Sequence, residues 1–168
     1  MKLFTYAALL VAALALSACN NPRAGMSGAD RDGVAAAGIA TTALGDPSDP
    51  TSIAHFNQRI GDRVLFVTDS SDLSGEAQSI LRAQAAWLRN NAQYQVLIEG
   101  HADERGTREY NIALGARRAD AVERFLASEG VPRNRLRTVS YGKERPVEAC
   151  PEQRCWDQNR RAVTVVSR

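Results

Sequence analysis

Residues 94–130 read YQVLIEGHADERGTREYNIALGARRADAVERFLASEG, an apolar strand pattern joined to a long helix pattern by a polar loop. The strand pattern covers residues 94–99, where apolar residues dominate. The helix pattern covers residues 107–129 and ends at Gly130, because glycine is a favoured helix stop. Polar loops that follow a strand often display ligand-binding side chains on a rigid scaffold. The loop at residues 100–107 is therefore the first candidate for a binding site.

The chain beyond residue 50 repeats this rhythm of strands and helices. Strands are expected at residues 63–67, 135–140 and 162–166, and a further helix at residues 74–90. In that helix, the residues expected to face the core recur at helical spacing: Ala77, Ile80, Leu81, Gln84, Trp87 and Leu88. The predicted order is strand, helix, strand, helix, strand, strand. It indicates an α+β fold, with a mixed sheet of about four strands packed against two main helices.

The helix at residues 107–129 carries an arginine within a largely apolar stripe. The positions of that stripe, taken at helical repeats, are Asn111, Leu114, Arg118, Val122 and Phe125. A guanidinium stays charged, so a buried one needs an anionic partner or a bound anion. Two plainer alternatives remain open, a salt bridge to a neighbouring element and a side chain that reaches solvent.

The N-terminus has the pattern of an export signal. A short charged start and an apolar run end in small residues, which predicts a signal peptide over residues 1–18. Residues 16–19, Leu-Ser-Ala-Cys, resemble the lipobox of bacterial lipoproteins, and the resemblance implies acylation of Cys19, with palmitate as a typical chain. Asn20 in place of aspartate implies sorting to the outer membrane. The alternative is a plain signal peptide followed by an incidental cysteine.

The composition separates a tether from a single domain. Residues 19–50 are rich in Gly, Ala, Ser, Asp and Pro and have few large apolar side chains, so we expect a lipidated N-terminus followed by a flexible tether. Residues 51–168 are expected to form one globular domain. The chain has 21 basic and 19 acidic residues, a formal net charge of +2, and this balance argues against nucleic acid as a partner.

The cysteines and histidines predict no metal site and no cofactor. Cys150 and Cys155 lie close together in a predicted loop before the last strand, and export to an oxidising compartment favours a disulfide between them. We expect this disulfide to support stability with little effect on ligand binding. His55 and His101 lack the ligand spacing that zinc sites require.

Several spaced motifs together resemble one known family. They are GHADERGT at residues 100–107, YN at 110–111, Leu114 with RRA at 117–119, VSYGKE at 139–144 and NRRAV at 159–163. This pattern is similar to the OmpA-like peptidoglycan-binding domains, and within them to the lipoproteins of the Tol-Pal system. The resemblance covers about residues 60–168 and agrees with the lipobox. It implies an OmpA-like fold, an outer-membrane anchor that faces the periplasm, and a role in cell division.

The resemblance also implies a ligand and residue roles. The ligand is the diaminopimelate residue of the peptidoglycan stem peptide, held without covalent chemistry. Asp103 is expected to accept hydrogen bonds from its ammonium and Arg118 to pair with its carboxylate. Asn111 and Leu114 are expected to line the pocket, and Asp69 to contact the stem peptide. The implied protein partners are TolB and other Tol proteins.

One segment departs from the family pattern. Members commonly read FDFDS where this chain has FVTDS at residues 66–70. Thr68 and Ser70 are expected at the rim of the pocket. Arg117 is also expected there, because it lies roughly 100° around the helix from Arg118, and it is alternatively a solvated residue. Asp69 is alternatively a turn acid at a helix entry. Arg160 and Arg161 are expected to make structural bridges, and contact with the wall or with a partner is the alternative.

Two other functions compete with wall binding. A wall hydrolase needs an activated nucleophile, a metal-bound water or two facing carboxylates, and the sequence offers none of these sets. His101 lies in the right loop for a general base but has no nucleophile in any known pattern. We therefore expect a binding domain and no enzyme. A pure protein-interaction module with a vestigial pocket remains the third possibility.

Overall fold

The computed structural model describes residues 44–168. The predicted signal peptide, Cys19 and most of the predicted tether lie outside the described residues. No helix within residues 44–168 is long and apolar enough to cross a membrane.

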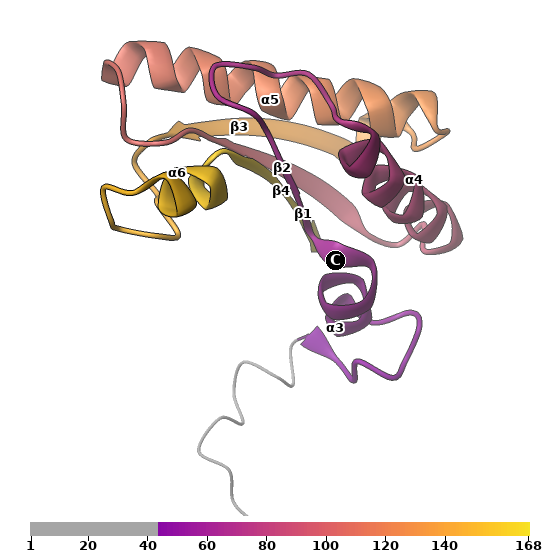
Figure 1. The fold of residues 1–168 in the computed structure, drawn as a ribbon. Coiled ribbons are helices and arrows are strands. Elements are labelled where there is room, and N and C mark those ends of the chain that lie inside the picture. The colour runs from indigo at the N-terminus through magenta and orange to yellow at the C-terminus, as the bar shows by residue number, and fades with distance from the viewer. Residues whose placement is uncertain (1–43) are drawn as a thin grey trace, which may run out of the picture. The chain divides into compact units, whose positions relative to one another are not determined.

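Four strands form one mixed sheet (Figure 1). They are β1 (Arg63–Leu65), β2 (Gln95–His101), β3 (Leu136–Gly142) and β4 (Arg161–Ser167), in the spatial order β1-β4-β2-β3. β2 and β3 pair in parallel, whereas β4 runs antiparallel to both β1 and β2. The predicted α+β class, with a mixed sheet of about four strands, is confirmed by this arrangement.

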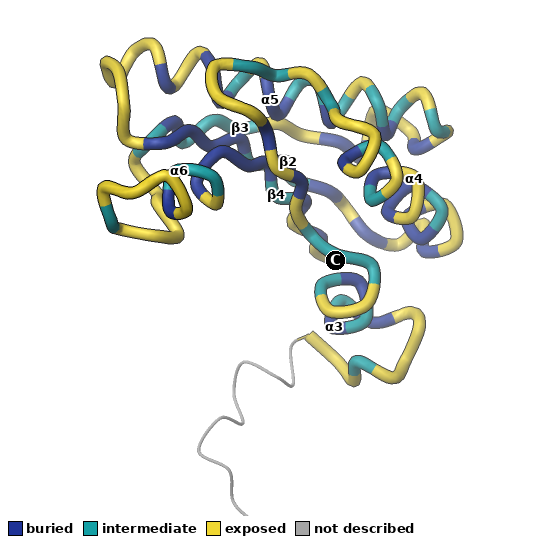
Figure 2. The backbone as a smooth tube through the Cα atoms, viewed as in Figure 1, coloured by how far each residue is buried: buried dark blue, intermediate teal, exposed yellow. Residues whose placement is uncertain are grey.

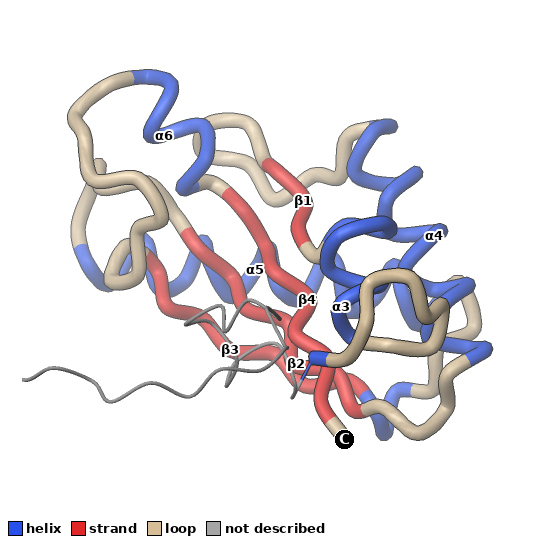
Figure 3. Tube along the Cα trace, turned by 90° about the horizontal axis from the view of Figure 1, so that it is seen from below, coloured by secondary structure: helices blue, strands red, loops and turns tan. Residues whose placement is uncertain are grey.

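The helices divide between the two faces of the sheet. They are α3 (Ile53–His55), the π-helical η1 (Phe56–Gly61), α4 (Gly75–Asn90), α5 (Arg108–Ser128), the 3₁₀ turn η2 (Arg133–Arg135) and α6 (Gln153–Asn159). α4 and α5 cover one face, and α6 lies on the opposite side (Figure 1). Seen from below, the strands lie in front of α5, and α6 lies near the end of the sheet where β4 begins (Figure 3).

The two long helices begin and end at residues that suit those positions. Ser74 and Thr107 are the N-caps of α4 and α5, and each hydroxyl accepts a hydrogen bond from the backbone N–H three residues later. After α5, Gly130 adopts a φ of 92°, the left-handed conformation that favours glycine at a helix end. These signals are local in sequence, which is why both helices lie within two residues of their predicted bounds.

The core lies between the sheet and the helices α4 and α5. In Figure 2 the sheet is mostly buried, and the helix turns that face it are buried too. The largest apolar members of this core include Phe56, Leu81, Leu88, Tyr94, Ile98 and Leu126. Gly100 and Gly115 let β2 and α5 approach closely, because a Cβ added at Gly115 would stand 2.8 Å from the carbonyl oxygen of Gly100.

Two predictions about the elements were wrong in detail. Residues 153–159 form α6, where the sequence predicted a loop, because seven residues are too few to show a helical repeat. The first strand ends at Leu65 instead of residue 67, although the N–H of Phe66 still donates to the carbonyl of Arg160. Val67 is exposed, so burial of its side chain does not stabilise a strand at that position.

The topology brings several chain segments to one edge of the sheet. Leu65 at the end of β1 pairs with Arg161 at the start of β4, and Gly100 near the end of β2 pairs with Ala162. β3 runs parallel to β2 and so ends at the same edge. We call this the site edge. The loops after β1, β2 and β3 and the start of α5 all meet there.

Candidate ligand-binding site

A cavity of about 260 Å³ opens at the site edge. Its lining combines charged, polar and apolar side chains: Thr68, Asp69, Asp103, Arg105, Gly106, Tyr110, Asn111, Leu114, Arg118 and Arg160. Three arginine cations therefore face two carboxylates. The surplus positive charge favours a ligand that brings an anionic group.

Arg118 is fully buried in the α5 face of this cavity. Its Nε donates to the carbonyl of Ser70 at 2.8 Å, Nη1 to that of His101 at 2.7 Å, and Nη2 to that of Val67 at 3.1 Å. The guanidinium thus joins α5 to the end of β2 and to the loop after β1. Two of its five N–H groups, one on each terminal nitrogen, are left for a ligand.

The charge of Arg118 is not neutralised by an ion pair within residues 44–168. Burial, together with the neighbouring cation of Arg160, lowers the pKa of Arg118 to about 10, although Asp103 and Asp69 act in the opposite direction. The side chain is therefore a cation at neutral pH. The sequence predicted that a buried arginine here would need an anion, and the backbone carbonyls satisfy its hydrogen bonds without supplying that charge.

Asp103 is the buried acid of the cavity. One carboxylate oxygen accepts from Arg105 Nη2 at 2.7 Å and from Arg160 Nη1 at 3.2 Å, and the other accepts from the backbone N–H of Arg105 at 3.2 Å. Burial alone would raise the pKa of Asp103, but these hydrogen bonds outweigh it and hold the pKa below its usual range. Asp103 is therefore ionised at neutral pH, and a carboxylate with about four acceptor positions has room for another donor.

The loop between β2 and α5 is held by its carbonyl groups. Lys143 Nζ donates to the carbonyls of Glu104 and Gly106, at 3.2 and 2.7 Å, and Asn111 Nδ2 donates to that of Arg105 at 2.7 Å. Gly106 has a φ of 89°, which favours glycine at this turn. These contacts preorganise the loop around Asp103.

The loop after β1 closes the other side of the cavity. Asp69 has a φ of 56°, a left-handed conformation that aspartate tolerates better than most residues. Its carboxylate accepts a hydrogen bond from the hydroxyl of Tyr110, which ties this loop to the first turn of α5. Thr68 is exposed at the mouth of the cavity.

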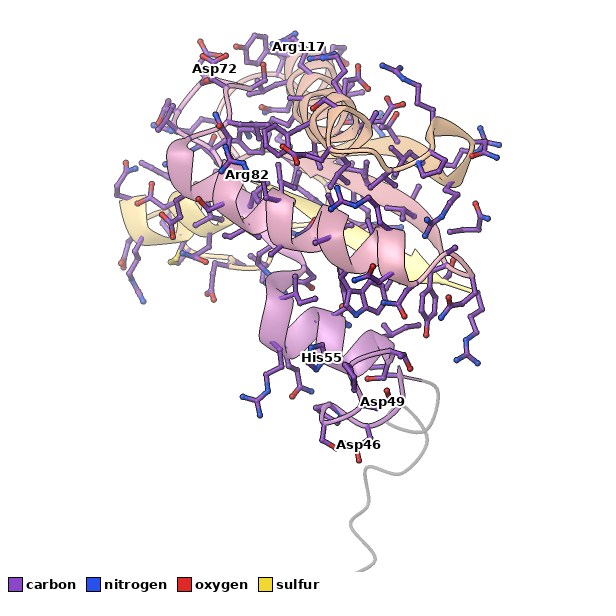
Figure 4. All side chains as sticks on the ribbon, turned by 90° about the vertical axis from the view of Figure 1, so that its right-hand side faces the viewer. Asp46, Asp49, His55, Asp72, Arg82 and Arg117 are labelled. Carbon is purple, nitrogen blue, oxygen red and sulfur yellow. A yellow bond between two sulfur atoms is a disulfide. The ribbon has the colours of Figure 1, made fainter. Side chains whose placement is uncertain are left out.

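The structure brings most of the predicted site residues together. Thr68, Asp69, Asp103, Asn111, Leu114 and Arg118 all line the cavity. Ser70 is half-buried and contributes its carbonyl to Arg118, but it does not line the cavity. Arg117 is exposed on the side of α5 away from the sheet (Figure 4) and also lies outside the lining.

The sequence did not assign Arg105, Tyr110 and Arg160 to the pocket lining. Tyr110 lies one helical turn before Leu114, so helical spacing offered a signal for it. Arg105 lay within the predicted binding loop, but nothing there distinguished it from a solvated residue. Arg160 could be placed only by knowing that β4 starts beside the end of β2.

Cys150 and Cys155 form the predicted disulfide, with Cα atoms 5.8 Å apart. The bond joins the loop after β3 to the buried face of α6. Within residues 44–168 no group of three or more His, Cys, Asp or Glu side chains could hold a metal ion.

His101 lies at the end of β2, outside the cavity lining. Its ring is buried 5.6 Å from that of Tyr141, and neither ring nitrogen has a hydrogen-bond partner among the described residues. Glu99 approaches Nε2 at 3.6 Å. Burial, together with the nearby cations of Arg161 and Arg145, lowers the pKa of His101 to about 4. The ring is therefore neutral in the folded protein at neutral pH.

The protein is expected to lose stability below about pH 6.5 because of His101. The unfolded chain binds a proton there while the folded ring stays neutral until the pH approaches 4. The free energy of unfolding should fall by about 2 to 3 kcal/mol between pH 7.5 and 4.5 from this group. Urea melts at these pH values check it, and a His101→Phe variant serves as the control. An equal fall in the variant would assign the loss to other groups.

Comparison with known proteins places the chain in a family. Residues 65–161 match the OmpA family. A peptidoglycan-associated lipoprotein of Mesorhizobium japonicum is 52% identical over 158 residues, 94% of this chain and 89% of the relative. One from Agrobacterium fabrum is 51% identical over 154 residues, 92% of this chain and 82% of the relative. The crystal structure of the peptidoglycan-associated lipoprotein from Burkholderia pseudomallei matches with a TM-score of 0.64 at 41% identity, over 73% of this chain and 100% of that one.

The fold and the cavity define a small α+β domain with a charged pocket at the site edge of its mixed sheet. The chain belongs to the OmpA family and, within it, to the peptidoglycan-associated lipoproteins. The family predicted from the motifs is thereby confirmed. The names of these relatives denote no enzyme, which agrees with the prediction of a binding domain.

Proposed function

We propose that the chain is an outer-membrane lipoprotein that binds peptidoglycan non-covalently through the diaminopimelate residue of the stem peptide. The observation that carries the proposal is a single cavity lined by a buried carboxylate, Asp103, and a buried cation, Arg118. A ligand that bears an ammonium and a carboxylate on one carbon satisfies both groups. The names of the relatives support peptidoglycan as the source of such a ligand.

Each charged group has a free position for this ligand. Asp103 can accept one more hydrogen bond, which suits an ammonium, and Arg118 has one free N–H on each terminal nitrogen, which suits a carboxylate. Asn111 and Leu114 line the same cavity. A cationic ligand without a carboxylate would leave Arg118 without a counter-ion, and an anionic ligand without an ammonium would leave the free acceptor position of Asp103 unused, so the pocket favours a zwitterion.

The rest of the proposal concerns the envelope. Acylation at Cys19 would hold the chain in the outer membrane, facing the periplasm, and residues 19–50 would let the domain reach the wall. We further propose TolB and other Tol proteins as partners, with a role in envelope integrity and cell division. Support for this part comes from the lipobox and from the relatives' description as lipoproteins.

Replacing Asp103 by asparagine should weaken binding to peptidoglycan at least about tenfold. The change keeps the shape of the side chain but removes the charge that an ammonium requires, and it removes the carboxylate that pairs with both Arg105 and Arg160. The measurement is co-sedimentation of the full chain with purified diaminopimelate-type peptidoglycan over a range of wall concentrations.

Asp72→Asn is the matched control, because Asp72 is an exposed acid of the loop after β1 that does not line the cavity (Figure 4). It should bind like the wild type. If the wild type stays in the supernatant, the wall-binding proposal fails and a protein-interaction module becomes the leading account. Release of soluble wall fragments during the incubation would instead point to a hydrolase.

A further inference from the structure

Helix α6 contacts the ligand-binding loop through one tryptophan. Trp156 Nε1 donates to Glu104 Oε1 at 3.0 Å, and the guanidinium of Arg105 lies 4.4 Å from the centre of the Trp156 ring. The same guanidinium holds the carboxylate of Asp103 at 2.7 Å. Trp156 therefore restricts the conformation of the Arg105 side chain, and Arg105 in turn orients the carboxylate of Asp103.

A second chain of contacts runs from α6 to the same carboxylate. Asp157 pairs with Nη2 of Arg160, whose Nη1 holds Asp103 at 3.2 Å. Arg160 is buried, and its Nε donates to the carbonyl of Phe66 at 3.1 Å. Both cations that hold Asp103 are thus themselves held by side chains of α6.

The conformation of α6 depends on its surroundings. A helix of seven residues is too short to be stable alone, and its N-cap, Glu152, makes no side-chain capping bond. The Cys150–Cys155 disulfide fixes one end of the segment. Asn159 fixes the other end, since its side chain bonds the backbone N–H of Val147 at 2.8 Å and the carbonyl of Glu148 at 2.8 Å.

We propose that α6, closed by the Cys150–Cys155 disulfide, is a positioning element of the ligand pocket, with Trp156 and Asp157 as positioning residues for Asp103. This inference rests on the proposed function for its ligand. The sequence predicted a disulfide that supports stability alone, whereas the contacts of α6 connect the disulfide to binding. Opening the disulfide frees α6, whose side chains hold Arg105 and Arg160, so the carboxylate of Asp103 loses its fixed orientation.

The first test compares two tryptophans. Trp156→Ala should raise the Kd of the full chain for a soluble, diaminopimelate-containing stem peptide about three- to tenfold, measured by calorimetry. Trp156→Phe keeps a ring beneath Arg105 and should recover part of that loss. Trp87→Phe is the control, because Trp87 is a buried tryptophan whose Nε1 bonds Pro50, remote from the cavity. Its Kd should stay at the wild-type value.

The second test opens the disulfide by a Cys150→Ser, Cys155→Ser double variant. An alternative is a dithiol, which transfers two electrons and two protons to the bond, leaving two thiols and its own cyclic disulfide. The Kd should again rise about three- to tenfold at a temperature where the chain stays folded. The pKa of the Asp103 carboxyl, followed by NMR without ligand, should rise as Arg105 and Arg160 loosen.

The outcomes separate the two proposals. Wild-type Kd values and an unchanged Asp103 pKa in both the Trp156→Ala and the double-serine variant would overturn the role of α6. If the wild type does not bind the stem peptide, the proposed function fails. The pKa of Asp103 then still decides whether α6 positions the carboxylate.

Discussion

Replacement of Arg118 by alanine is expected to abolish retention on peptidoglycan and to lower the free energy of unfolding by about 2 to 4 kcal/mol. Truncation removes the cation that is proposed to pair with the ligand carboxylate. It also removes the guanidinium that donates to the carbonyls of Val67, Ser70 and His101, and opens a void beside Phe66. Relief of the buried charge offsets part of this loss. Co-sedimentation and urea melts measure the two effects separately.

Arg117→Ala provides a matched control one residue away. Arg117 is exposed and does not line the cavity, so its loss should change stability by less than about 0.5 kcal/mol and leave binding unchanged. The binding assay must be run well below the melting temperature of Arg118→Ala. If that variant, while folded, still pellets with the wall as the wild type does, Arg118 is not part of the binding site.

Replacement of Gly100 by alanine is expected to lower the free energy of unfolding by about 2 to 3 kcal/mol, or more if the backbone cannot yield. The new Cβ would overlap the carbonyl oxygen of Gly115 on α5, and it would also stand 3.2 Å from Ala119. β2 and α5 would have to separate at the point where they bring Asp103 and Arg118 to the same cavity. The melting temperature should fall by roughly 10 °C.

Gly75→Ala is the control for this prediction. Gly75 begins α4, and a Cβ added there meets no atom within 4 Å. Because alanine favours helix more than glycine does, the control should be neutral or slightly stabilising. A Gly100→Ala protein that melts like the wild type would mean that β2 and α5 separate without cost, which would contradict the close packing of the two elements.

The two charged groups that are proposed to bind the ligand also hold the structure around the pocket. Asp103 and Arg118 were predicted as ligand groups, and the structure adds a second role for each. Arg118 joins three segments through their carbonyls, and Asp103 joins Arg105 to Arg160. Any variant at these positions therefore needs a stability measurement beside the binding measurement.

The parts of the fold that could be predicted are those with local signals. Both long helices carry a capping hydroxyl at the start and a repeat of apolar residues, and their bounds were predicted to within two residues. The strands at residues 95–101 and 161–167 have buried, apolar runs that need no partner to be recognised. The helix α6 has neither signal, because it is held by a disulfide and by the side chain of Asn159.

The sequence alone determined the family, the α+β class and the identity of the main charged residues, because these depend on residue type and on spacing along one element. Only the tertiary structure decided which loops meet. The antiparallel start of β4 beside the end of β2 brings Arg160 to Asp103, and the close approach of Gly100 to Gly115 sets α5 against the sheet. Contacts between residues 57 positions apart along the chain depend on strand order and register, and no local pattern encodes either of these.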